Sequence, residues 1–159
     1  LGGEKRRGSR RGGRGKGHAR ARGGLPRIAA PGRERVGREE MARAGDEMVV
    51  ESVREPSWGR CVVVGRGGVL AEAVSDTAVA VAPLSETDVA HMLDGLRGKK
   101  VLDGFRDLPR CDRAGIGVVG SAVGRLLVDQ PEIREVESSP LRVNEAGAVA
   151  LDALIVLRE

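Results

Sequence analysis

Two apolar segments near the C-terminus, joined by a short turn, constrain the fold of this chain most strongly. Residues 136–143 carry apolar side chains among polar ones, and residues 149–157 are apolar except for Asp152. The residues from Asn144 to Gly147 are typical of a turn, and Gly147 can adopt a positive φ at little cost. The pattern predicts two antiparallel strands that pair as a hairpin.

Acidic residues interrupt this apolar hairpin. Glu137 and the adjoining Glu135 belong to the first strand, and Asp152 belongs to the second. A carboxylate among apolar residues loses hydration energy unless a positive partner meets it. Because Mg²⁺ takes oxygen ligands and commonly shares them with phosphates, the hairpin is compatible with a magnesium site. An edge hairpin with solvated acids also explains these residues, and both interpretations stay open at this point.

Strand and helix patterns upstream predict the remaining layers. Residues 47–53 and 60–64 form a strand pair around a turn that contains proline and glycine. Alternating alanine and valine over residues 77–82 suit a buried strand. Ser85 begins a helix with a capping box, and a second helix covers residues 112–128. The order predicts an α+β fold in which an antiparallel sheet is backed by two helices.

Helical spacing identifies the buried stripes of the two helices. The first stripe is Val89, Met92, Leu93 and Leu96, and the second is Ile116, Val119, Val123, Leu126 and Leu127. Gly115, Gly117 and Gly120 in the second helix match a dinucleotide-binding fingerprint, but no strand pattern precedes them. Each interior glycine weakens a helix by about 1 kcal/mol relative to alanine.

Residues 1–35 differ in composition from the rest of the chain. Glycine and arginine dominate there, so the segment cannot bury enough apolar surface to offset its ordering entropy. We predict a disordered tail over residues 1–35 and a folded domain over residues 36–159. Residues 1–44 contain 14 Lys and Arg against 4 Glu, whereas the remaining residues contain 13 basic and 19 acidic side chains. The folded part is therefore acidic, and the excess positive charge belongs to the tail.

Other sequence signals restrict the classes of function. Cys61 and Cys111 have no metal-ligand spacing, and we expect free thiols in a reducing cytoplasm. No apolar run is long enough to span a membrane. The sequence contains no Ser/His/Asp or Cys/His constellation, so it offers no candidate catalytic nucleophile.

Five short strings occur in a consistent order between residues 36 and 157. They are Gly65-Arg66-Gly67-Gly68 with Glu72, Ala82-Pro83-Leu84, Leu102-Asp103-Gly104-Phe105-Arg106, E-V-E-S-S-P-L at residues 135–141, and G-A-V-A-L-D-A at residues 147–153. Together they resemble the ATP-grasp domain of NDP-forming acyl-CoA synthetases, which include the ADP-forming acetate–CoA ligases and relatives of succinyl-CoA synthetase β subunits. That family carries E-L-D-I-N-P-L followed by A-L-D-A-R-I at its end.

The resemblance implies a site for ATP or ADP with Mg²⁺. It places Glu39 near the adenine and Glu47 at the ribose or the phosphate-bound metal. It gives the glycine turn of Gly65, Gly67 and Gly68 either a phosphate-side or a structural role.

The resemblance also implies three metal ligands, two of which depart from the family pattern. Asp152 matches the family aspartate, Ser139 stands where the family has asparagine, and Glu137 stands where it has aspartate. Because a serine hydroxyl is a shorter and poorer Mg²⁺ ligand than an amide oxygen, we expect a decayed or specialised site.

The implied reaction joins a carboxylic acid, CoA and ATP to give acyl-CoA, ADP and phosphate. CoA and the acid would bind to domains or to a subunit that this chain lacks, and the first ATP-grasp lobe is also missing. Since the chain begins with leucine, we expect a fragment that is inactive alone. Two alternatives are a nucleic-acid-binding protein that uses its Arg/Gly-rich arm, and a structural remnant without a ligand.

The tail prediction can be tested directly. Backbone amides of residues 1–35 should exchange with solvent without protection, because nothing apolar anchors them. Hydrogen exchange followed by mass spectrometry or NMR measures this, and a protected helix or strand in the segment would contradict the prediction.

Overall fold

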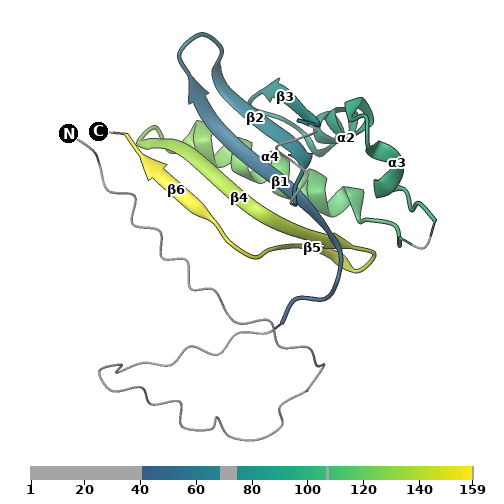
Figure 1. Ribbon diagram of the computed structural model, residues 1–159. Helices are drawn as coiled ribbons and strands as arrows, with labels where there is room; N and C mark the ends of the chain where they lie inside the picture. Colours follow the sequence, from purple (N-terminus) through teal and green to yellow (C-terminus); the bar gives the residue numbers. More distant parts are fainter. Residues whose placement is uncertain (1–40, 69–74, 107, 159) are drawn as a thin grey trace, which may run out of the picture. The chain divides into compact units, whose positions relative to one another are not determined.

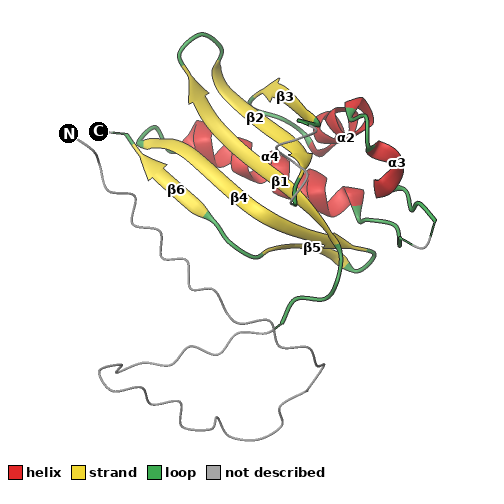
Figure 2. Ribbon diagram, in the orientation of Figure 1, coloured by secondary structure: helices red, strands yellow, loops and turns green. Residues whose placement is uncertain are grey.

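The computed structural model describes residues 41–68, 75–106 and 108–158 of the chain. These residues belong to a compact unit that begins at Glu40. Figure 1 shows an antiparallel sheet with helices packed against one of its faces, and Figure 2 shows the helices behind the strands. The predicted fold class, an α+β arrangement with an antiparallel sheet, is therefore confirmed. The predicted tail lies outside the described residues.

Within the described residues, the sheet has six strands, and all of them pair antiparallel. Its order is β3-β2-β1-β4-β5, and β6 pairs with β4 beside β5. The strands are β1 (Asp46–Glu55), β2 (Gly59–Arg66), β3 (Thr77–Val81), β4 (Ile133–Asn144), β5 (Gly147–Ala150) and β6 (Leu154–Leu157). The strand pair predicted around residues 55–59 is β1 and β2, and Gly59 has a φ of 81° in their turn.

The C-terminal hairpin differs from its prediction. The second strand is divided into β5 and β6, and Asp152 lies in the connection between them. The cause is an irregularity in β4, where Val50 pairs with Ser138 but Met48 pairs with Leu141. The extra residue in β4 bends that strand, so a single straight strand cannot follow its whole length.

The strand predicted as buried over residues 77–82 is instead the edge strand β3. Val79 and Val81 are 62% and 54% exposed, because they point away from the helices. In addition, no strand of the described part pairs with the outer edge of β3. Ala78 and Ala80 point the other way and pack against the core. The Ala/Val alternation thus marks a strand with one covered face.

Three helices are described: α2 (Glu86–Gly95), α3 (Lys99–Leu102) and α4 (Arg113–Asp129). The predicted capping box at the start of α2 is confirmed, since Asp88 N donates to Ser85 Oγ over 3.2 Å and Ser85 N donates to Asp88 Oδ2 over 2.8 Å. Asp112 caps α4 by accepting from Gly115 N over 3.0 Å. The short α3 was not predicted.

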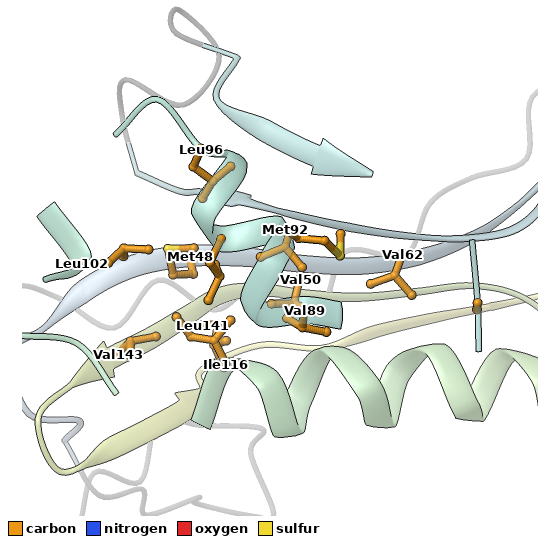
Figure 3. Close-up of a cluster of buried hydrophobic side chains, with 13 residues drawn as sticks. Met48, Val50, Val62, Val89, Met92, Leu96, Leu102, Ile116, Leu141 and Val143 are labelled. Carbon is orange, nitrogen blue, oxygen red and sulfur yellow. The ribbon is translucent and has the colours of Figure 1, made fainter. Parts of the chain in front are cut away.

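The core lies between the helices and the covered face of the sheet (Figure 3). It is built almost entirely from aliphatic and methionine side chains, as the near absence of aromatic residues requires. Its fully buried members include Met48 and Val50 of β1, Leu93 of α2, Ile116 of α4 and Leu141 of β4.

The glycines of α4 form the centre of its buried face, which the aliphatic stripe alone did not indicate. Gly117, Gly120 and Gly124 are buried, whereas Val119 and Val123 are only partly buried. A Cβ atom on Gly120 would lie 2.9 Å from Val89 Cγ2, and one on Gly124 would lie 2.9 Å from Val62 Cγ2. These glycines therefore let α4 approach α2 and β2 closely, and the fingerprint-like spacing serves helix packing.

This packing predicts opposite effects for two Gly-to-Ala substitutions. Gly120→Ala should lower the free energy of unfolding by about 1–3 kcal/mol, because the stiff Val89 side chain cannot easily move aside. Gly95→Ala, at the end of α2, meets no atom within 4 Å and should be neutral or stabilising by up to about 1 kcal/mol. Urea unfolding measures both. Equal effects of the two substitutions would contradict the close-packing account.

Candidate functional site

The face of the sheet opposite the helices carries the polar groups of interest; we call it the open face. Along β1, Met48, Val50 and Ser52 are buried toward the helices. The intervening residues Glu47 and Glu51 therefore point to the open face, because successive strand residues alternate between faces.

An acidic cluster lies at the middle of this open face. Glu51 of β1 pairs directly with Glu137 of β4, and Glu135 follows on the same face two residues away. Burial raises the pKa of Glu51, and the neighbouring charges of Glu135 and Glu137 raise it further. The arrangement disfavours the ionised form of Glu51, as expected when like charges meet across two strands.

A second group of polar residues lies toward the start of β1. Arg142 of β4 pairs with Glu47, and its Nη2 donates to Glu47 Oε1 over 2.7 Å. Arg142 Nη1 also donates to the carbonyl oxygen of Gly45 over 3.3 Å. The guanidinium thus fixes the position of the Glu47 carboxylate on the open face.

The glycine turn after β2 also lies against Glu47. Gly67 N donates to the carbonyl oxygen of Glu47 over 2.6 Å, and a Cβ atom on Gly67 would lie 3.1 Å from that oxygen. Gly68 has a φ of 87°, and its open Cβ position lies 3.5 Å from Glu47 Oε2. The structure therefore brings Glu47, Gly67 and Gly68 together, and only glycine allows this approach without strain.

Gly65 lies apart from that turn and has a packing role. It is buried within β2, opposite Thr77 of β3, whose Cγ2 atom would lie 2.6 Å from an added Cβ. Glu39, expected near an adenine, lies outside the described residues.

The three predicted metal ligands lie along β4 and its neighbouring connection. Glu137 points to the open face, and Ser139 lies at the irregularity of β4, next to Pro140. Asp152 follows Leu151, whose N–H donates to the carbonyl oxygen of Pro140 over 3.0 Å, and precedes Leu154, which pairs with Glu137. These two contacts place the connection that contains Asp152 beside the 137–140 segment. Asp152 itself is exposed and does not lie in a paired strand as predicted.

Two residues of the open face were missed by sequence reasoning. Glu51 could have been identified from its spacing, because it lies four residues after Glu47 in the same strand and so shares its face. Arg142 gave no local signal, since its role depends on pairing with a residue 95 positions away. Among the described residues, no three Asp, Glu, His or Cys side chains converge closely enough to hold a metal by themselves.

The sequence matches the ATP-grasp domain family over residues 32–157. Among characterised relatives, the β subunit of ADP-forming acetate–CoA ligase I from Pyrococcus furiosus is 30% identical over 117 residues, which cover 74% of this chain and 50% of that subunit. A trans-feruloyl-CoA synthase from an unknown prokaryotic organism is 33% identical over 121 residues, which cover 75% of this chain but 17% of that protein. The chain thus spans half of the first relative and a smaller part of the second.

Solved structures give the same relationship. The dinucleotide-forming acetyl-CoA synthetase 1 of Candidatus Korarchaeum cryptofilum, solved with coenzyme A and Mg-AMPPCP, matches with a TM-score of 0.70 and 35% identity. The match covers 74% of this chain and 55% of that one. The form of this enzyme with coenzyme A alone matches with a TM-score of 0.72 and 35% identity over 75% of this chain and 53% of that one. The chain therefore belongs to the ATP-grasp family, and its relatives are ADP-forming acyl-CoA synthetases.

Proposed function

We propose that the chain is the C-terminal lobe of the nucleotide site of an ADP-forming acid–CoA ligase. Its role is to hold Mg-ATP or Mg-ADP while an acid, CoA and ATP are converted to acyl-CoA, ADP and phosphate. The lobe contributes oxygen ligands and backbone groups, and it contributes no nucleophile.

The observation that carries the proposal is the uncovered, acidic face of the sheet, with a glycine turn at one end. Glu47 is held by Arg142 and lies against Gly67 and Gly68, so this end offers a fixed carboxylate beside exposed backbone. Glycine turns after a strand allow close approach of an anion such as a phosphate. A relative of known structure binds Mg-AMPPCP, which supports a nucleotide at the equivalent lobe.

The oxygen donors proposed here suit an Mg²⁺ ion whose coordination is shared between the protein and the nucleotide, rather than an ion that the protein holds by itself. Glu137 and Asp152 supply carboxylate oxygens and Ser139 supplies a hydroxyl, which are the hard ligands that Mg²⁺ prefers. Since Mg²⁺ usually retains waters and phosphate oxygens, two carboxylates are sufficient when the nucleotide completes the shell. Bound there, Mg²⁺ would neutralise phosphate charge during transfer of the phosphoryl group.

The remaining requirements of the reaction belong to other parts of the enzyme. The first ATP-grasp lobe, the CoA site and the acid site are expected in a longer chain or a partner subunit, and this chain alone is expected to be inactive. The names of relatives refer to acetate, trans-feruloyl-CoA and 4-hydroxybutyrate. Because this lobe is common to all of them, we assign the specificity for the acid to another part of the enzyme. The free thiols of Cys61 and Cys111 favour a cytoplasmic location. In the described part of the chain, no helix is long and apolar enough to cross a bilayer.

Nucleotide binding by the lobe can be measured by NMR titration of the full chain with ADP and Mg²⁺. Amide shifts should concentrate at Glu47, Gly67, Gly68 and the 137–140 segment, and should disappear when EDTA removes the metal. Ser139→Asn should tighten binding roughly fivefold, the equivalent of about 1 kcal/mol, by adding a better oxygen ligand.

Ser57→Asn in the exposed β1–β2 turn is the matched control and should not change the affinity. Shifts confined to the helical face, or shifts that are independent of Mg²⁺, would reject the nucleotide site. Strong binding of an oligonucleotide that falls steeply with salt would instead favour the Arg/Gly-rich arm as the functional element.

The electrostatics of the open face generate a pH-dependent prediction. Because the pKa of Glu51 is raised in the folded state, its ionisation destabilises the fold as the pH rises past the ordinary carboxyl pKa, and this cost is complete above the raised pKa. Glu51→Gln should therefore raise the free energy of unfolding at pH 7 by about 0.2–1 kcal/mol, the usual size of a cross-strand pair interaction. The gain should vanish as the pH falls below the ordinary carboxyl pKa. Urea unfolding across this range checks it, with exposed Glu145→Gln as the control.

A further inference from the structure

The strand β6 exposes apolar side chains on both of its faces. Leu154, Ile155 and Leu157 are 47%, 52% and 59% exposed. Leu154 pairs with Glu137 and so belongs to the open face, whereas Ile155 pairs with the buried Val136 and belongs to the helical side. The helix layer therefore does not cover this strand, which lies at the margin of the sheet in Figure 1.

The outer edge of β6 also has unused backbone groups. The chain from Leu151 to Arg158 follows β4, because Leu151 N donates to Pro140 O over 3.0 Å and Arg158 N donates to Glu132 O over 2.7 Å. In the described part of the chain, no strand pairs with the opposite edge of β6. An apolar edge without Pro or Lys is a template for pairing with another strand.

The charges that flank β6 identify the partner. Asp152 and Arg158 lie three residues before and three residues after Ile155, in the string Asp-Ala-Leu-Ile-Val-Leu-Arg. Antiparallel pairing of two identical strands about Ile155 places Arg158 of each copy opposite Asp152 of the other. It also places Leu154 opposite Val156 on the open face. The side chains of Asp152 and Arg158 are both exposed, and neither forms an ion pair with a described residue.

We propose that β6 is a self-association surface, on which a second copy of this chain adds its own β6 antiparallel and continues the sheet across a two-fold axis. Two Asp152–Arg158 pairs set the register, and the apolar residues between them lose their exposure to water. The symmetric placement of opposite charges favours a second copy over an unrelated strand. The edge strand β3 is also apolar, but it has no flanking charges at equal spacing around its centre. This inference and the proposed nucleotide site both use Asp152, as an ion-pair partner here and as an Mg²⁺ ligand there, so the dimer is expected for the chain without Mg²⁺ and nucleotide.

The test is sedimentation equilibrium of the full chain at low salt. The wild-type chain should form a dimer, and Ile155→Lys should raise the dimer dissociation constant by roughly tenfold or more, because two lysines would meet at the axis. Val79→Lys on β3 is the matched control, since it places the same charge on an exposed valine of the other edge strand and should leave the dimer unchanged.

A charge exchange tests the register. Asp152→Arg and Arg158→Asp should each weaken the dimer roughly tenfold, since two attractive pairs become repulsive. The double variant, which exchanges the charges, should restore the wild-type dissociation constant to within about threefold. A monomer at all concentrations, a dimer sensitive to Val79→Lys but not to Ile155→Lys, or a double variant no tighter than the single ones would each overturn the proposal.

Discussion

The antiparallel pairing of β1 with β4 is the interaction on which the rest of the structure depends. It joins segments that are about 90 residues apart and forms the centre of the sheet, with β2 and β3 added on one side and β5 and β6 on the other. It fixes which residues share a face. Because Glu51 pairs with Glu137 and Glu47 pairs with Arg142, one pairing assembles both the acidic cluster and the held carboxylate of the open face.

The covered face owes its close packing to residues that look unfavourable in isolation. Gly117, Gly120 and Gly124 each reduce the intrinsic stability of α4, by about 1 kcal/mol relative to alanine. Their lack of side chains allows the helix backbone to approach Val89 and Val62, and aliphatic side chains fill the remaining space. Dispersion contacts and burial along the helix offset the local cost. A rigid covered face in turn holds the opposite side chains in place.

The open face and the edge of β6 share one physical property. Each exposes groups that folded proteins usually pair or cover, which are carboxylates on the open face and apolar side chains with free backbone groups on β6. Three carboxylates near the middle of a sheet raise the free energy of the ionised state, as the raised pKa of Glu51 indicates. An apolar edge strand costs hydration free energy in a similar way. The chain spans about half of the β subunit it resembles. In the function and the dimer proposed above, Mg²⁺ with a nucleotide would lower the electrostatic cost of the open face, and a second strand would cover the edge of β6.

Local patterns in the sequence determined the kinds of element and their order. The capping box at Ser85, the strand pair around residues 55–59, the helix over residues 112–128 and the family strings all depend on neighbours within a few positions, so they were readable without a structure. Tertiary structure decided which faces are covered. Val79 and Val81 are exposed because they lie on the open face of the edge strand β3. The last strand is divided because β4 bends at Ser139 and Pro140, and the glycines of α4 are buried because α2 and β2 pack there. The opposition of Glu51 to Glu137 and the contact of Arg142 with Glu47 likewise arise from long-range pairing. Spacing along the chain specifies the periodicity of a side-chain pattern, but burial and charge contacts depend on the segment that packs against it.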